Sequence, residues 1–286
     1  MSGLKIGVLH PGAMGESLAA TAKNTGHEVY WASAGRSHET RQRAMKHDLQ
    51  DAMTVENLSG ICSVIVSVCP PHAAEAVASQ VLASGFKGLY LDANAISPDR
   101  AKRIGGWMAQ VGISFVDGGI IGGPAWEPKT TRLYLAGEDA DRAASCFSAG
   151  PLETRILGDS IGRASALKMC YAAYSKGTTA LLCAVLAAAE GLGIRDELEE
   201  HWSWDRSEHL AQAKERVRRA SAKAWRFVAE MHEIEMTLGS VGLPGGFHFA
   251  AGEIYDRMAR FKGETDMPPL EEVLHSLTHP AERSAA

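Results

Sequence analysis

Residues 5–17 read KIGVLHPGAMGES, an apolar run that leads directly into a glycine-containing turn and a helix-forming segment. In a dinucleotide-binding turn, one glycine permits the tight turn, one lets backbone amides approach the pyrophosphate, and one lets the helix pack on the strand. Gly7, Gly12 and Gly15 keep their places in the pattern G-x-x-G-x-G-x-x-G, while His10 stands where the glycine of the tight turn belongs. The pattern predicts a phosphate-binding turn of altered construction.

The residue after His10 compensates for the missing glycine. Pro11 fixes φ near about −65° and supports the turn, at the cost of one N–H donor. We expect the phosphates to rest on backbone amides at the helix start, where the helix dipole also favours an anion. The predicted cofactor-binding residues here are Gly12, Ala13, Met14 and Gly15. An ordinary βα turn has the same composition, and the position after the first strand of an alternating pattern favours the nucleotide.

Length and composition describe an ordinary globular protein. The chain has 286 residues, enough for two domains, with 45% hydrophobic and 22% charged residues and a formal charge of −5. A nucleic-acid surface needs a basic excess, so we expect no nucleic-acid partner. We find no basic segment leading into a long apolar run and no stretch approaching the roughly 20 apolar residues of a membrane span. We therefore expect a cytoplasmic protein without a membrane partner.

The thiols and imidazoles form no recognisable metal site in the sequence. The five cysteines have no C-x-x-C pair, and the eleven histidines have no zinc-binding spacing. We expect reduced cysteines and no metal.

The chain changes character near residue 160. Short apolar runs alternate with helical segments before that point, which predicts a parallel sheet covered on both faces. These runs occupy residues 5–10, 27–32, 63–70, 88–94 and 113–119, and a further strand is expected over 132–138. Beyond Ile161 the strand signals vanish, and an alanine-rich helix is expected over residues 163–191. The predicted fold is α/β, a doubly wound Rossmann domain over residues 1–160, followed by an all-α domain over 161–286 that supplies substrate and dimer contacts.

The end of the second predicted strand bears on the choice of coenzyme. A carboxylate there would bind the ribose hydroxyls of NAD and repel the extra phosphate of NADP, and none is present. Ser33, Arg36 and Ser37 instead offer hydroxyls and a guanidinium suited to phosphate. We expect NADP, with NAD also possible. A solvated Arg36 in a surface loop remains the alternative.

Five segments in order give the chain a family resemblance. They read IGVLHPGAMGESLA, VSVCPP, LDANAISP, VDGGIIGGP and IGRASALK. This order resembles the β-hydroxyacid dehydrogenase superfamily of 6-phosphogluconate and 3-hydroxyisobutyrate dehydrogenases and the related imine reductases. The nearest branch joins a 6-phosphogluconate-dehydrogenase-like NAD-binding domain to a C-terminal domain of unknown function. The resemblance implies that Cys69 and Pro70 line the cofactor, that Asn94 lies near the nicotinamide ribose, and that Gly122 and Gly123 belong to the substrate-binding turn.

The same resemblance implies a catalytic lysine at position 168. A lysine has an ordinary pKa of about 10.4 and must be desolvated, or placed beside a positive charge, to exchange protons near neutrality. Lys168 lies in the least polar segment of the chain, which favours a functional role over a solvated one. Tyr171 and Ser175 share its helical face and are expected to act on the substrate or assist the lysine. His248 is a further candidate for substrate contact, although a packed histidine is the commoner case.

Two departures from the family pattern leave the substrate open. Hydroxyacid dehydrogenases carry an asparagine four residues after the lysine, where this chain has Ala172, and a serine before the two glycines, where it has Ile121. The expected activity is hydride transfer between the nicotinamide and a small carbonyl or hydroxyacid-like substrate. An imine reductase acting on C=N and a non-catalytic NADP-binding sensor remain alternatives. The alanine-rich helix, together with the habits of the family, predicts a homodimer.

Overall fold

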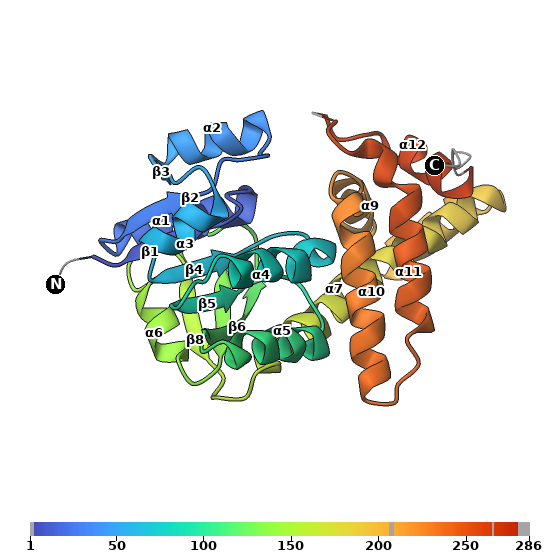
Figure 1. Ribbon diagram of the computed structural model, residues 1–286. Helices are drawn as coiled ribbons and strands as arrows, with labels where there is room; N and C mark the ends of the chain where they lie inside the picture. The colour runs from blue at the N-terminus through green and yellow to red at the C-terminus, as the bar shows by residue number, and fades with distance from the viewer. Residues whose placement is uncertain (1–2, 206–208, 265, 280–286) are drawn as a thin grey trace. The chain divides into compact units, whose positions relative to one another are not determined.

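The computed structural model describes residues 3–205, 209–264 and 266–279 (Figure 1). The chain divides into two compact units, Met1–Met169 and Cys170–Ala286. The boundary falls inside helix α7 (Arg163–Gly191), which has the same bounds as the helix expected from the sequence. The sequence places the change of domain ahead of this helix, whereas the first turns of α7 form their contacts with the sheet.

The described residues of the first unit form an eight-stranded sheet with the order β3-β2-β1-β4-β5-β6-β7-β8. The strands are β1 (Lys5–Val8), β2 (Glu28–Trp31), β3 (Gln50–Asp51), β4 (Val64–Ser67), β5 (Leu89–Asp92), β6 (Ser114–Ile121), β7 (Arg132–Ala136) and β8 (Glu153–Ile156). The strand order reverses between β1 and β4, and ligands bind beside the carboxyl ends of strands at such a point. The predicted Rossmann sheet followed by a helical region is confirmed.

The far edge of the sheet departs from a simple parallel arrangement. Strands β6 and β7 pair antiparallel, while the other neighbours pair in parallel. No helix is described in residues 122–131 between them, and a connection without a crossover element returns the chain in the opposite direction. The sequence did not predict β3 or β8. Both are short strands with polar residues, so they lack the apolar run that marks a buried strand.

Helices cover both faces of the sheet, and alternate residues of the central strands enter two separate hydrophobic cores. Helices α1 (Ala13–Asn24) and α6 (Ala140–Ser145) pack on one face. Helices α3 (Val55–Ile61), α4 (Ala74–Ala83) and α5 (Pro98–Gln110) pack on the other. Val64 and Val66 of β4 enter the first core, and Ile65 enters the second. Central strands buried on both faces explain the nearly continuous apolar runs in the sequence.

The second unit is helical throughout its described residues. It contains the rest of α7 together with α8 (Arg195–Asp205), α9 (His209–Ser221), α10 (Ala224–Ser240), α11 (Gly246–Arg257) and α12 (Leu270–Thr278). Lys176 of α7 forms an ion pair with Glu230 of α10, and its backbone carbonyl accepts a 2.7 Å hydrogen bond from the buried Tyr255 hydroxyl of α11. These contacts fix α7, α10 and α11 as one packed group.

Helix α7 corrects one expectation from the sequence. Among the described residues, it is the one helix long and apolar enough to cross a membrane by length and composition, so the statement that no stretch approaches a span is wrong on that measure. In the window concerned, 44% of the residues are buried inside the protein. Core helices of globular proteins share this composition, so the measure is weak evidence for a membrane.

Two helical glycines give a test of the packing. A Cβ on Gly15 would lie 2.2 Å from the His10 carbonyl oxygen, whereas a Cβ on Gly106 of α5 would meet nothing within 4 Å. We expect Gly15→Ala to lower the free energy of unfolding by about 1–3 kcal/mol through overpacking. Gly106→Ala should raise it by roughly 0.5–1 kcal/mol through helix propensity. Urea unfolding of both variants checks this, and equal effects would contradict the described α1 packing.

Candidate active site

The turn between β1 and α1 has one open position and one closed position. Gly12 is the N-cap of α1, with φ −73° and ψ −173°, and a Cβ there would meet nothing within 4 Å. Gly15 is closed, because its α-carbon faces the His10 carbonyl. The two glycines therefore have separate roles. Gly15 lets the helix pack on the strand, and Gly12 leaves a bare backbone face for a ligand.

The first turn of α1 presents its amides without a protein cap. No side chain among the described residues caps the helix, so the backbone N–H groups of Ala13, Met14 and Gly15 are not used by a side-chain acceptor. Glu16 also lies in this turn, but it is buried and its Oε2 lies 3.5 Å from the His47 Nε2. An uncapped helix start behind a bare glycine suits an anion such as a pyrophosphate.

Arg36 lies close enough to the glycine turn to affect its electrostatics. Burial and, to a lesser extent, the positive charge of Arg36 together lower the pKa of His10 to about 4, so the imidazole is neutral at pH 7. The guanidinium also acts on the Cys69 thiol, whose pKa burial raises to about 12. Within the described residues, the buried Nε of Arg36 has no hydrogen-bond partner. A half-buried guanidinium with an unused donor, near both His10 and Cys69, differs from a solvated loop residue.

A second arginine follows Arg36 and was not identified from the sequence. Arg41 donates to the Ser33 carbonyl oxygen through its Nη2 at 2.9 Å, and the Arg36 backbone N–H donates to the same oxygen at 3.2 Å. Ser33 is buried, and the Ser37 hydroxyl accepts from the Thr40 N–H as the N-cap of α2 (His38–Lys46). The end of β2 thus combines arginines with a helix N-terminus, a combination suited to phosphate. The sequence feature that could have identified Arg41 is its position about one helical turn after Ser37, which places it near the start of α2.

Asn94 joins the ends of strands β4 and β5. Its Oδ1 accepts from the Cys69 backbone N–H at 2.6 Å, and its Nδ2 donates to the Ser67 hydroxyl at 3.1 Å. The residue is only 3% exposed. Asn94 therefore holds the loop that contains Cys69 and Pro70, the two residues expected to line the cofactor. Its own predicted contact with the nicotinamide ribose stays a prediction.

Asp92 ends β5 with a buried carboxyl group. Its Oδ1 accepts from the Asn94 backbone N–H at 3.0 Å, and its buried Oδ2 has no hydrogen-bond partner in the described residues. The pKa of Asp92 is raised to about 7, mainly because the carboxyl group is buried; the charge of Asp117 also raises it, and hydrogen bonding by Asn94 opposes the shift. The two carboxyl groups are neighbours because Asp92 and Asp117 pair across β5 and β6.

The carboxylate of Asp117 caps helix α7. Its Oδ2 accepts from the backbone N–H groups of Gly162, Ala164 and Ser165 at 2.9, 3.0 and 3.1 Å. Its Oδ1 accepts from the Ser165 hydroxyl at 2.6 Å. Asp117 is buried, and it was not among the residues predicted from the sequence to have a functional role. An acidic residue directly after a buried apolar run was the available signal.

Lys168 follows this cap by one turn of helix. A Cβ on Gly119 would lie 3.2 Å from the Lys168 Cβ and 2.6 Å from the Ala164 carbonyl oxygen, so the helix packs directly on β6 at this glycine. Lys168 is half-buried and lies in the same compact unit as the glycine turn. The fold therefore places the lysine at the carboxyl end of the sheet.

The predicted substrate turn follows β6. Gly122 has φ +124°, and a Cβ there would lie 2.3 Å from the Thr130 carbonyl oxygen. The Gly123 carbonyl accepts a 2.7 Å hydrogen bond from the Thr131 hydroxyl, which fixes the turn. Both glycines are exposed. Glycine is thus required for backbone reasons at position 122, whatever the turn binds.

The remaining predicted residues belong to the helical unit. Tyr171 is 50% exposed, and its carbonyl oxygen accepts a 2.9 Å hydrogen bond from the Ser175 hydroxyl. His248 is buried, with its Nε2 3.2 Å from the Ala173 carbonyl oxygen. A carbonyl only accepts, so Nε2 carries the proton, and the buried Nδ1 has no partner among the described side chains. His248 thus has a packing contact with α7, and its predicted role toward substrate is untested.

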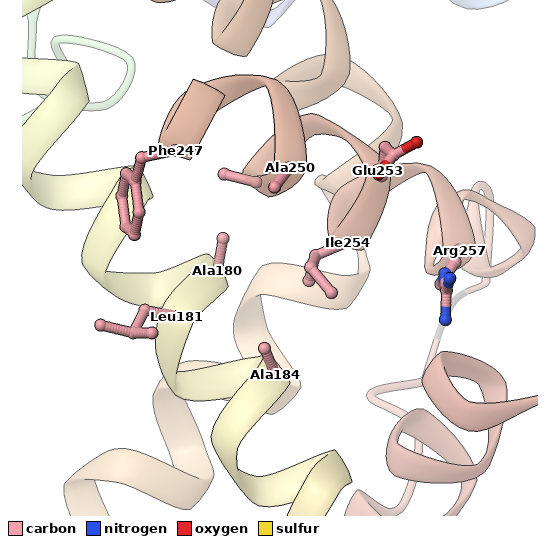
Figure 2. Close-up of a pocket in the computed structure, with 9 residues that line it drawn as sticks. Ala180, Leu181, Ala184, Phe247, Ala250, Glu253, Ile254 and Arg257 are labelled. Atoms are coloured by element: carbon pink, nitrogen blue, oxygen red, sulfur yellow. The ribbon is translucent and has the colours of Figure 1, made fainter. Parts of the chain in front are cut away.

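A hollow of about 260 Å³ lies elsewhere in the helical unit. Figure 2 shows Ala180, Leu181 and Ala184 of α7 on one side of it and Phe247, Ala250 and Ile254 of α11 on the other. Ala251, Glu253 and Arg257 complete the lining. None of the predicted site residues lines it, so it adds nothing to the active site. No group of three or more potential metal ligands occurs in the described part of the chain.

Comparison with known families agrees with this geometry. Residues 5–147, half of the chain, match the NAD binding domain of 6-phosphogluconate dehydrogenase. The chain belongs to this family. Residues 189–258 match a second family, a domain of unknown function. The match covers the glycine turn, the end of β2 and the Asn94 loop, so the open face at Gly12 and the unused Arg36 donor lie in an NAD(P)-binding domain.

Individual relatives resemble the chain over most of its length. An uncharacterized 28.5 kDa protein of Methanothermus fervidus is 29% identical over 198 residues, which are 69% of this chain and 75% of that protein. A solved structure of a conserved protein of unknown function, described as similar to 3-hydroxyacid dehydrogenases, is 27% identical with a TM-score of 0.65. That match covers 90% of this chain and 98% of the other.

More distant structures share the fold. Mycobacterium tuberculosis 3-hydroxyisobutyrate dehydrogenase with L-serine has a TM-score of 0.68 at 17% identity, covering 97% of this chain and all of the other. An imine reductase variant from Myxococcus stipitatus in complex with NAD+ has a TM-score of 0.56 at 17% identity, covering 95% and 99%. Together with the family match, these neighbours support an NAD(P)-binding oxidoreductase.

The glycine turn yields a test of cofactor binding. Because Gly12 has an ordinary φ and open space beyond its α-carbon, Gly12→Val should leave the fold intact and fill the space for the pyrophosphate. We expect NADPH fluorescence titration to detect no binding by this variant. His10→Gly should change the affinity much less, because the position serves only the turn. Equal losses from both variants would show that the roles of the two positions are misassigned.

The buried Asp92 carboxyl group gives a pH-dependence. Its folded pKa of about 7 lies above the ordinary value of 3.8, so the folded state binds the proton more tightly than the unfolded state. Protonation of Asp92 therefore adds its full contribution to the free energy of unfolding below about pH 4. This contribution decreases as the pH rises from about 4 to 7, and above that range it no longer changes with pH. Asp92→Asn keeps an acceptor for the Asn94 N–H and removes this dependence. Urea unfolding from pH 4 to 8 should show a steeper loss of stability in the wild type, and parallel profiles would contradict the assignment.

Proposed function

We propose that this chain is an NADP-preferring oxidoreductase that transfers a hydride between the nicotinamide and the carbonyl or hydroxy carbon of a small, hydroxyacid-like substrate. Lys168 is the general acid/base, and Tyr171 assists it. One observation carries the proposal: Lys168 is packed on β6 at Gly119, in the same compact unit as the bare amides at Gly12. A proton-transfer group and a nucleotide site on one rigid sheet are what such a reaction needs.

The bound nicotinamide coenzyme would supply or accept the hydride. The chain supplies the remaining functions. The amides at the start of α1 would hold the phosphates, and the Asn94 side chain fixes the loop of Cys69 and Pro70. During reduction, the Lys168 ammonium Nζ would donate a proton to the substrate oxygen. During oxidation, the neutral amine would accept that proton from the hydroxyl.

The preference for NADP rests on the end of β2. Arg36 has an unused buried donor, Arg41 lies within reach of the same backbone turn, and α2 begins at Ser37. A 2′-phosphate would gain charge-assisted hydrogen bonds from guanidinium groups. NAD lacks this phosphate and would leave the Arg36 donor unused.

Two alternatives have specific support. The apolar Ile121 before Gly122 and Gly123, and the likeness to an imine reductase, favour reduction of a C=N bond. Lys168 counts against that reading, because the imine reductases this chain resembles usually have aspartate or tyrosine there. Ala172, where the resemblance implies a substrate-binding asparagine, favours a nucleotide sensor without turnover.

The homodimer proposal rests on the exposed surface of α7. Exposed apolar side chains on α7, including Tyr171 and Leu181 at 50% each and Val185 at 37%, support a second copy as partner. We retain the homodimer, the small-molecule substrate and the cytoplasmic location as proposals, with neither nucleic acid nor membrane as a partner.

The coenzyme preference gives the first test. Arg36→Asp replaces the guanidinium with a carboxylate that repels a 2′-phosphate and can accept from ribose hydroxyls. We expect the ratio of NADPH to NADH affinity to fall by about tenfold or more, which corresponds to the loss of a charge-assisted hydrogen bond. Titration of both coenzymes measures it, with exposed Arg163→Asp as the control. An unchanged ratio would remove Arg36 from the site.

The lysine gives the second test. NADPH oxidation is followed with a panel of aldehydes, 3-oxoacids and cyclic imines. We expect turnover on an aldehyde or 3-oxoacid, and Lys168→Ala should lower kcat by about 10²–10⁴-fold, the usual contribution of a general acid. Lys87→Ala, at an exposed turn, should retain full activity. Turnover restricted to imines would favour the imine reductase, and tight NADPH binding without turnover would favour the sensor.

A further inference from the structure

Asp117 has more hydrogen bonds to α7 than an ordinary cap. An N-cap residue immediately precedes its helix and satisfies one or two of the free N–H groups. Asp117 lies on β6, about 45 residues before α7, and accepts from Gly162, Ala164 and Ser165. The helix therefore starts where the strand places the carboxylate.

The same strand also sets the distance of the helix from the sheet. Asp117 and Gly119 are two residues apart, so they point to the same face of β6. A side chain at position 119 would collide with the Ala164 carbonyl and press on the Lys168 Cβ. Asp117 thus fixes where α7 begins, and the bare Gly119 fixes how closely its first turn approaches.

We propose that Asp117 is a positioning residue for Lys168, acting through the start of α7. This inference rests on the proposed function, in which Lys168 transfers the proton. The carboxylate holds the first turn of the helix, and Lys168 follows on the next turn, where its Cβ packs against Gly119 of β6. Loss of the cap would let the first turn fray and the ammonium group leave its place, while the coenzyme site at Gly12 would be unchanged.

The primary experiment does not need a substrate. Full-length wild type and Asp117→Asn are compared by amide hydrogen exchange and by acetylation with sulfosuccinimidyl acetate, followed peptide by peptide in mass spectrometry. Asparagine keeps one acceptor oxygen but loses the charge and the second acceptor. Exchange in the peptide covering residues 162–168 should rise about tenfold, as expected for a lost cap, and Lys168 should be acetylated about fivefold faster.

Lys176 on the same helix is the internal control. It is held by Glu230 in the helical unit, so its acetylation rate should not change. Equal acceleration at Lys168 and Lys176 would mean general destabilisation and would overturn the proposal. Unchanged exchange and labelling would overturn it as well.

A milder variant keeps the test valid if Asp117→Asn does not fold. Ser165→Ala removes the hydroxyl bond to Oδ1 and leaves the backbone bonds to Oδ2. It should accelerate Lys168 labelling in the same direction but less. If Asp117→Asn cannot be obtained and folded Ser165→Ala shows no faster acetylation of Lys168, the proposal is overturned.

Kinetics separates this proposal from the proposed function. On whichever panel substrate is turned over, Asp117→Asn should lower kcat with little change in the KM for NADPH. The double variant Asp117→Asn/Lys168→Ala should be no slower than Lys168→Ala alone, because the two residues act in one pathway. If Lys168→Ala keeps full activity, the proposed function fails whatever the labelling shows. If labelling changes and kcat does not, the positioning role fails by itself.

Discussion

The hydrogen bonds between the Asp117 carboxylate and the start of α7 are the constraint on which the rest of the structure depends. A buried carboxylate is costly unless its oxygens are satisfied, and a helix start is costly unless its amides are. In this chain the Asp117 oxygens accept hydrogen bonds from the amides at the start of α7, so each group satisfies the other, although they are about 45 residues apart in the sequence. The result is that a helix shared by both compact units has its first turns fixed to the sheet.

The electrostatics at the carboxyl ends of β1, β2 and β4 depend on the helix starts and arginines that lie there. The helix starts of α1 and α2 and the side chains of Arg36 and Arg41 make this edge positive, although the whole chain carries a formal charge of −5. His10 stays neutral there because burial and the nearby guanidinium oppose its protonation. The positive potential therefore comes from groups that remain charged at any physiological pH.

The parts of the fold that could be predicted from the sequence are those marked by apolar runs and glycines. Strands β1, β2, β4, β5, β6 and β7, the bounds of α7 and the glycine turn could be predicted, because buried strands and helix starts have strong local signals. Strands β3 and β8 could not be predicted, because they are short and polar and lie at the edges of the sheet, where pairing with the neighbouring strand determines their conformation. The roles of Asp117 and Arg41 were also missed, because an acidic residue after an apolar run and an arginine one helical turn from Ser37 are weak signals that do not name the partner: a backbone about 45 residues away for Asp117, and the Ser33 carbonyl for Arg41. The resemblance supplied Lys168, which spacing alone could not distinguish from a solvated lysine.

The position of the unit boundary has an evolutionary consequence. The sheet unit ends at Met169 and so contains the glycine turn, the β2 arginines and Lys168, whereas Tyr171, Ser175 and His248 belong to the helical unit. Under the proposed function, substitutions in the helical unit would alter residues proposed to contact the substrate, while the coenzyme turn and Lys168 belong to the other unit. Such a division would let related chains keep one coenzyme site and change their substrates.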